Sequence, residues 1–69
     1  MYHVDVDKLN GKITERRTTK EAIAAVIGVD RSTLYRRIKD GRLLIGDIHG
    51  ICDALHLTTE EAVDIFLAQ

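Results

Sequence analysis

Residues 19–38 read TKEAIAAVIGVDRSTLYRRI, and this stretch predicts two short helices joined by a tight turn. Ile23 and Val26 lie at helical spacing and are expected to bury one face of the first helix. Gly28 is suited to the left-handed conformation that ends a helix. Asp30 is a favourable N-cap for the second helix, because its carboxylate accepts from the free amides of the next turn. The stretch therefore predicts a helix-turn-helix.

The second helix of this pair, residues 31–40, has an unusual outer face. Leu34 and Ile38 are expected to point inward, while Arg, Tyr and hydroxyl-bearing residues point outward. Arg side chains fork onto guanine, and Ser or Thr hydroxyls reach bases or phosphates, so such a face suits the major groove of DNA. A solvated surface helix is the plainer alternative. The outward residues are Arg31, Ser32, Thr33, Tyr35, Arg36 and Arg37.

This segment resembles the helix-turn-helix of the lambda-repressor-like family, of the Cro/CI or XRE type. The run from Asp30 to Arg36 is similar to the start of the recognition helix in small phage-type repressors, and residues 55–67, LHLTTEEAVDIFL, resemble the last helix of that group. The resemblance implies a compact five-helix all-α domain and a phage or prophage transcriptional regulator, most simply a repressor that occupies an operator. The positions that carry the match are Ala24, Gly28, Val29, Asp30 and Leu34.

The contacts expected on DNA divide into two sets. Tyr35 either packs on a thymine methyl group or covers the helix stem, while Arg37 and Arg42 are equally well explained as surface charges. Lys20 occupies a position where many family members carry a Gln that contacts a phosphate. The expected base contacts come from Arg31, Ser32, Thr33, Tyr35 and Arg36, and the expected phosphate contacts from Lys20, Arg16, Arg17, Arg37, Lys39 and Arg42.

The charge distribution agrees with a DNA-facing half. The chain has a net charge of −1, but all ten Lys and Arg residues lie between Lys8 and Arg42. That stretch carries +6, whereas residues 43–69 carry −5. The basic half is expected to face the phosphates and the acidic half to point away.

Three further helices are expected, over about residues 5–16, 45–55 and 59–67, beside those at 19–27 and 31–40. Thr58 and Glu61 form a capping box at the start of the last helix. At the start of the helix at 19–27, the cap is either Thr18, in a box with Glu21, or Thr19. The expected core comprises Val6, Leu9, Ile13, Ile23, Ala24, Ile27, Val29, Leu34, Ile38, Ile45, Ile48, Ile51, Cys52, Leu55, Leu57, Ala62, Ile65 and Phe66.

The helix at 45–55 holds two other features. Gly46 and Gly50 lie four residues apart, which indicates close packing against a neighbouring helix. His49, Cys52 and His56 share a face, but Cys52 lies on the apolar stripe and no second Cys is available. We therefore expect no metal site and no cofactor. No nucleophile turn or phosphate-binding loop is present, so an enzyme is not expected.

The 69 residues are expected to form one domain. No signal peptide or membrane span is recognisable, so we expect a cytoplasmic protein with no membrane partner and no small-molecule ligand. One recognition helix reads too few base pairs for a genome, which favours a homodimer on a palindromic operator. Val63 and Leu67 are candidates for the dimer contact. The alternative function is a protein-interaction adaptor or antirepressor that uses the same scaffold.

Overall fold

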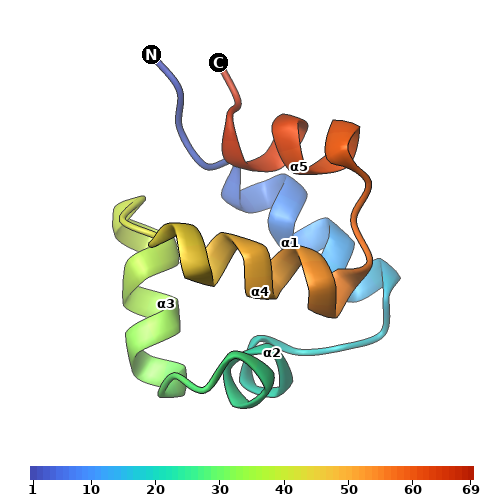
Figure 1. Cartoon of the computed structure of the whole chain (residues 1–69). Helices are drawn as coiled ribbons and strands as arrows, with labels where there is room; N and C mark the ends of the chain where they lie inside the picture. The colour runs from blue at the N-terminus through green and yellow to red at the C-terminus, as the bar shows by residue number, and fades with distance from the viewer.

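The computed structural model describes all 69 residues and is all-helical (Figure 1). The five predicted helices are present, with ends that differ from the predicted ones by at most one residue, and no strand is formed. The helices are α1 (Val6–Glu15), α2 (Lys20–Ile27), α3 (Arg31–Asp40), α4 (Ile45–Leu55) and α5 (Thr59–Phe66).

Local capping explains where these helices begin. Thr19, and not Thr18, caps α2, because its hydroxyl accepts from the Ala22 amide at 3.1 Å. The predicted capping box of α5 is confirmed: the Thr58 hydroxyl accepts from the Glu61 amide at 3.1 Å, and the Glu61 carboxylate accepts from the Thr58 amide at 3.0 Å. Each contact satisfies an amide that has no partner within the helix.

All five helices enclose the core. In Figure 1, α1 and α5 lie above α4, α2 lies below it, and α3 runs down the left side. Residues at helical spacing on every helix meet in the core, as the periodicity predicts. Seven other residues expected in the core are half-buried around it: Val6, Ile27, Val29, Ile48, Cys52, Leu57 and Ala62. The fully enclosed centre consists of Leu9, Leu34, Ile51, Leu55 and Ile65.

Two apolar residues expected in the interior are on the surface. Ile45 is 73% exposed and Val26 is 72% exposed. Ile45 is the first residue of α4, at the end of its apolar stripe, and Val26 lies on the outer side of α2. Helical periodicity defines a stripe, but it does not show how far the neighbouring helices cover that stripe.

The two helical glycines differ in their surroundings. A Cβ on Gly50 would overlap Cγ2 of Ile27, so the expected close packing is present there, between α4 and α2. A Cβ on Gly46 would meet no atom within 4 Å, so the prediction of close packing at Gly46 is wrong.

The two ends of the chain lie side by side (Figure 1). The amide of His3 donates to the carbonyl of Ala68 at 2.9 Å, and the amide of Ala68 donates to the carbonyl of His3 at 3.0 Å. The Asp5 amide also donates to the Ile65 carbonyl at 2.7 Å. These bonds hold the start of α1 against the end of α5. None of the helices has both the length and the apolar character required to cross a bilayer.

Candidate nucleic-acid interface

The turn that positions α3 is built as the sequence indicates. Gly28 has φ 80° and ends α2, and its amide donates to the Ala24 carbonyl at 2.9 Å. The Asp30 carboxylate then accepts from the Ser32 amide at 3.0 Å and starts α3. A residue with a Cβ is disfavoured at this φ, so Gly28 fixes the change in direction between the two helices.

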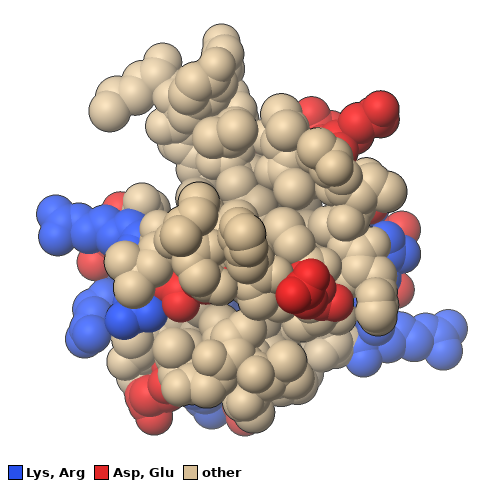
Figure 2. Space-filling view, viewed as in Figure 1, with Lys and Arg blue, Asp and Glu red and all other residues tan.

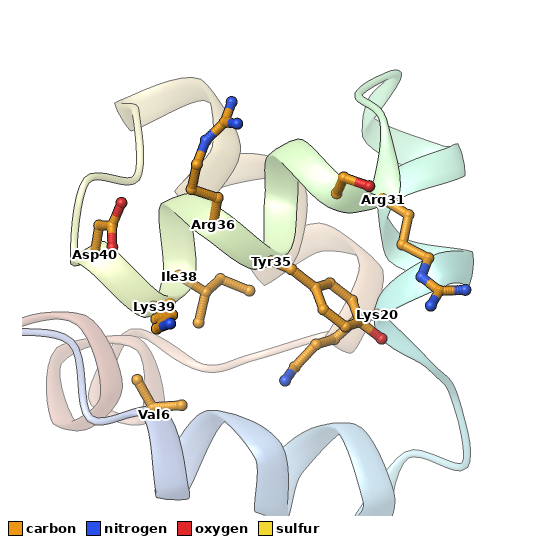
Figure 3. Close-up of a pocket in the computed structure, with 9 residues that line it drawn as sticks. Val6, Lys20, Arg31, Tyr35, Arg36, Ile38, Lys39 and Asp40 are labelled. Atoms are coloured by element: carbon orange, nitrogen blue, oxygen red, sulfur yellow. The ribbon is translucent and has the colours of Figure 1, made fainter.

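The outer face of α3 is basic. Leu34 and Ile38 are buried, which turns the remainder of the helix toward solvent. The α3 face borders an open hollow of about 800 Å³ that extends toward the start of α1 and the start of α2 (Figure 3). Four cations and one acid line it, so the hollow is cationic. These five residues are Lys20, Arg31, Arg36, Lys39 and Asp40.

Tyr35 organises one end of this hollow. The Lys20 ammonium lies 5.0 Å from the centre of the Tyr35 ring, and the Arg31 guanidinium carbon lies 5.4 Å from it. Figure 3 shows the ring between these two side chains, whereas Arg36 extends from another side of α3. Contacts of a cation with an aromatic face contribute about 0.5–1 kcal/mol at exposed sites. Tyr35 therefore brings a cation of α2 and a cation of α3 together.

Glu21 is an acidic residue at the edge of this cationic cluster. Its carboxylate lies 3.0 Å from Nη1 of Arg31, and both side chains are more than half exposed. The pair links the first turn of α2 to the first residue of α3. Exposed pairs contribute about 0–1 kcal/mol, so a phosphate can displace the carboxylate at low cost. This contact cannot be read from the sequence, because the two residues lie on different helices, ten positions apart.

Arg37 does not belong to the same face as Arg36. Its Nη1 donates to both carboxylate oxygens of Asp47 on α4, at 3.2 and 3.0 Å. Asp47 is only 6% exposed and also accepts from the Leu44 amide at 3.0 Å. The sequence placed Arg37 on the outer face as a phosphate contact or a surface charge. In the structure it joins the end of α3 to the start of α4.

Arg16 likewise makes contacts within the chain. Its Nε donates to the Leu55 carbonyl at 2.9 Å, and its Nη2 lies 3.7 Å from the Glu61 carboxylate. Leu55 ends α4, eight residues after Asp47, so these two arginine sites are about 12 Å apart along the helix. Figure 2 shows Lys and Arg side chains on opposite sides of the molecule.

The predicted phosphate contacts are therefore not all brought together. Arg16, and Arg17 in the turn that follows it, lie at the end of α1, which meets the end of α4. Lys39 and Arg42 lie at the end of α3, beside the start of α4, and are exposed. Thr33 is half-buried, whereas Ser32 is exposed. The structure groups Arg31, Arg36 and Lys39 with Lys20 around the hollow. It separates them from Arg16 and Arg17 at the end of α1.

Glu61 anchors α1 to α5. Its carboxylate pairs with Lys12, which also contacts Glu15 at 3.0 Å. The Lys12 ammonium, followed by the Thr58 amide, lowers the pKa of Glu61 to about 2, and the same pair raises the pKa of Lys12. Burial raises the pKa of the Cys52 thiol, and no three His, Cys, Asp or Glu side chains gather as metal ligands.

No protein-family model matches this chain, and no curated protein or solved structure matches it either.

Proposed function

We propose that this chain binds double-stranded DNA in a sequence-specific way and acts as a transcriptional regulator of the lambda-repressor-like type. The observation that carries the proposal is the α3 face, whose Arg36, Ser32 and Lys39 side chains are exposed on a helix held by a buried Leu34 and Ile38. An exposed helix with this composition, set off by a fixed turn, fits the width of the major groove.

In this proposal α3 enters the major groove and α2 approaches the phosphates. Arg36 forks onto a guanine, and Ser32 hydrogen-bonds a base or a phosphate. Lys20 contacts a phosphate next to the free amides at the start of α2, and Tyr35 keeps its ammonium beside Arg31. Arg31 then exchanges the Glu21 carboxylate for a phosphate or a base.

Not all of the cations expected to contact phosphates keep that role in this proposal. Arg16 and Arg37 hold helices together, so the phosphate set reduces to Lys20, Lys39 and Arg42, with Arg17 on a remote side. Two copies on a palindromic operator block an overlapping promoter. Each phosphate contact steepens the dependence of binding on salt by about one unit in the log–log slope.

Selection from a pool of random duplexes at physiological salt tests the proposal. Enrichment of a common motif supports it, and retention without enrichment favours the adaptor function. The matched pair of variants is Arg36→Ala and Arg17→Ala, which remove the same charge. We expect Arg36→Ala to weaken binding by about 1–3 kcal/mol and to relax specificity at one base pair. Arg17→Ala is expected to leave the preferred sequence unchanged.

A further inference from the structure

A groove runs between α4 and α5, away from the cationic hollow. It consists of two adjoining depressions of about 190 and 330 Å³, which share Ile48, Thr59 and Ala62 in their walls. The groove has no lining residue in common with the cationic hollow beside α3. We name it the α4–α5 groove.

The two ends of the α4–α5 groove differ in chemistry. Ile45, Val63 and Leu67 border the end formed by the start of α4 and the end of α5, and they are 73%, 45% and 49% exposed. Asp53 and Thr58 line the opposite end, where α4 ends and α5 begins. A contiguous group of exposed apolar residues on a small domain indicates a surface that binds a partner.

The acids of this half of the chain are only partly neutralised. Residues 43–69 carry five acids and no Lys or Arg. Arg37 pairs with Asp47. Lys12 pairs with Glu61. The acids that remain exposed and form no ion pair are Asp53, Glu60 and Asp64.

Two of these three free acids belong to the α4–α5 groove. Asp53 lines it, and Glu60 lies at its edge, one helical turn from Val63. Asp64 instead lines a separate hollow with two lysines of α1. Figure 2 views the molecule with α4 in front and shows acidic side chains within this face, with Lys and Arg only at its margins.

We propose that the α4–α5 groove binds a basic amphipathic helix of a partner protein. Apolar side chains of that helix fill the end bordered by Ile45 and Leu67, and its Lys or Arg side chains pair with Asp53 and Glu60. The lining residues of α4 extend from Ile45 to Asp53, or about 12 Å along the helix. This length accommodates about two turns of a partner helix, with apolar residues one turn apart.

The walls of the groove favour a helix over an extended peptide. Both walls are helices, whose backbone groups bond within the helix, so they offer no strand edge to which an extended peptide can add. The side chains of a third helix can instead pack between those of α4 and α5. Gly46, where a Cβ would meet no other atom, leaves the α4 backbone open to close approach.

Charge selects a basic partner over the other possible occupants. A second copy would bring Asp53 and Glu60 toward the same two carboxylates, and these acids also repel nucleic acids and anionic lipid surfaces. A Lys or Arg placed beside them forms an ion pair instead. The apolar end supplies most of the affinity, and the acidic end sets the charge of the partner.

Selection from a display library of helical peptides of about 14 residues tests the proposal. Peptides retained by the wild-type chain are counter-selected on a chain that carries both Ile45→Ser and Leu67→Ser, which keeps the acids and removes two apolar borders. Enrichment of helices that combine a net positive charge with an apolar stripe supports the proposal. Acidic or uncharged peptides, or no enrichment over the double variant, overturn it.

The affinity of a selected peptide, measured by fluorescence anisotropy, tests each end of the groove. We expect Asp53→Asn and Glu60→Gln each to weaken binding by about 1.5- to 5-fold, whereas Asp64→Asn, outside the groove, leaves it unchanged. Ile45→Ala should weaken binding by about 3- to 10-fold. Val26→Ala, at an equally exposed position on α2, should not. Circular dichroism establishes that all five variants fold.

Two results would refute the assignment even if a basic peptide is selected. An equal loss of affinity in Asp64→Asn and Asp53→Asn would show that the peptide responds to net charge and not to the groove. Sedimentation equilibrium of the free chain gives the other: self-association that Ile45→Ala abolishes would assign the groove to a second copy, whereas a monomer supports the proposal.

This inference goes beyond the proposed function and does not rest on it. The peptide assays contain no DNA, and the groove shares no residue with the cationic hollow. Failure of the duplex selection would therefore refute DNA binding and leave the peptide result in place, and failure of the peptide selection would refute only the α4–α5 groove.

Discussion

Replacing Arg37 by Met should destabilise the fold without weakening DNA binding by the folded protein. Arg37 lies on α3 but donates to the carboxylate of Asp47 at 3.0 and 3.2 Å. Met retains most of the apolar stem and removes only the guanidinium group. Asp47 is then left with the Leu44 amide as its hydrogen-bond donor.

The magnitude follows from the burial of the two partners. Removing one partner of a fully buried ion pair costs about 3–5 kcal/mol. The Asp47 side chain is 7% exposed, whereas that of Arg37 is 29% exposed, so solvent screening lowers the expected loss to about 2–3 kcal/mol. A domain of this length has a total stability of about 3–10 kcal/mol. The melting temperature should therefore fall by about 10–20 °C.

Two assays, each applied to two variants, test this prediction. Urea denaturation measures the free energy of unfolding, and fluorescence anisotropy with the selected duplex, well below the melting temperature, measures DNA affinity. Lys39→Met is the matched control, because it removes a charge two residues further along α3 at an exposed position. We expect Arg37→Met to lose stability alone and Lys39→Met to lose affinity alone.

A double-mutant cycle isolates the pair itself. The single variants Arg37→Met and Asp47→Leu are combined, and the interaction energy is the departure of the double variant from additivity. The double variant should lose less stability than the sum of the losses of Asp47→Leu and Arg37→Met, because no unpaired charge remains buried. A loss below 0.5 kcal/mol for Arg37→Met, together with weaker DNA binding, would refute the structural role of this residue.

Three further outcomes are expected. Gly50→Ala should cost about 1–3 kcal/mol, since its Cβ would overlap a side chain of α2, whereas Gly46→Ala, in open space, should stabilise the helix by about 0.5–1 kcal/mol; urea midpoints compare the two. The pKa of Glu61 is lowered from 4.5 to about 2, so wild-type stability should decline as pH falls from 4.5 through about 2. A Glu61→Gln variant that declines as steeply over this range would contradict that origin. Glu21→Gln should strengthen DNA binding up to about fivefold at low salt, because Arg31 no longer exchanges a carboxylate for a phosphate; equal or weaker binding by titration would count against this.

The sequence by itself determined the local elements of this protein. The Thr58–Glu61 box, the Asp30 cap and the left-handed Gly28 each depend on groups within four residues of one another, so they are readable from the order of residues. Helical periodicity likewise identified the five segments and nearly all of the buried centre, because it reports which side of each helix is apolar.

Only the tertiary structure decided how these segments meet. Arg36 and Arg37 are adjacent in sequence, yet Arg37 reaches the buried Asp47 of α4, whereas Arg36 extends from the solvent-exposed face of α3. Ile45 continues an apolar stripe, yet it lies beyond the cover of the neighbouring helices. The crossing of two helices depends on side chains far apart in the chain, and no local pattern records it. The division of the arginines into those that join helices and those exposed on α3, and the exposure of Ile45, follow from that packing.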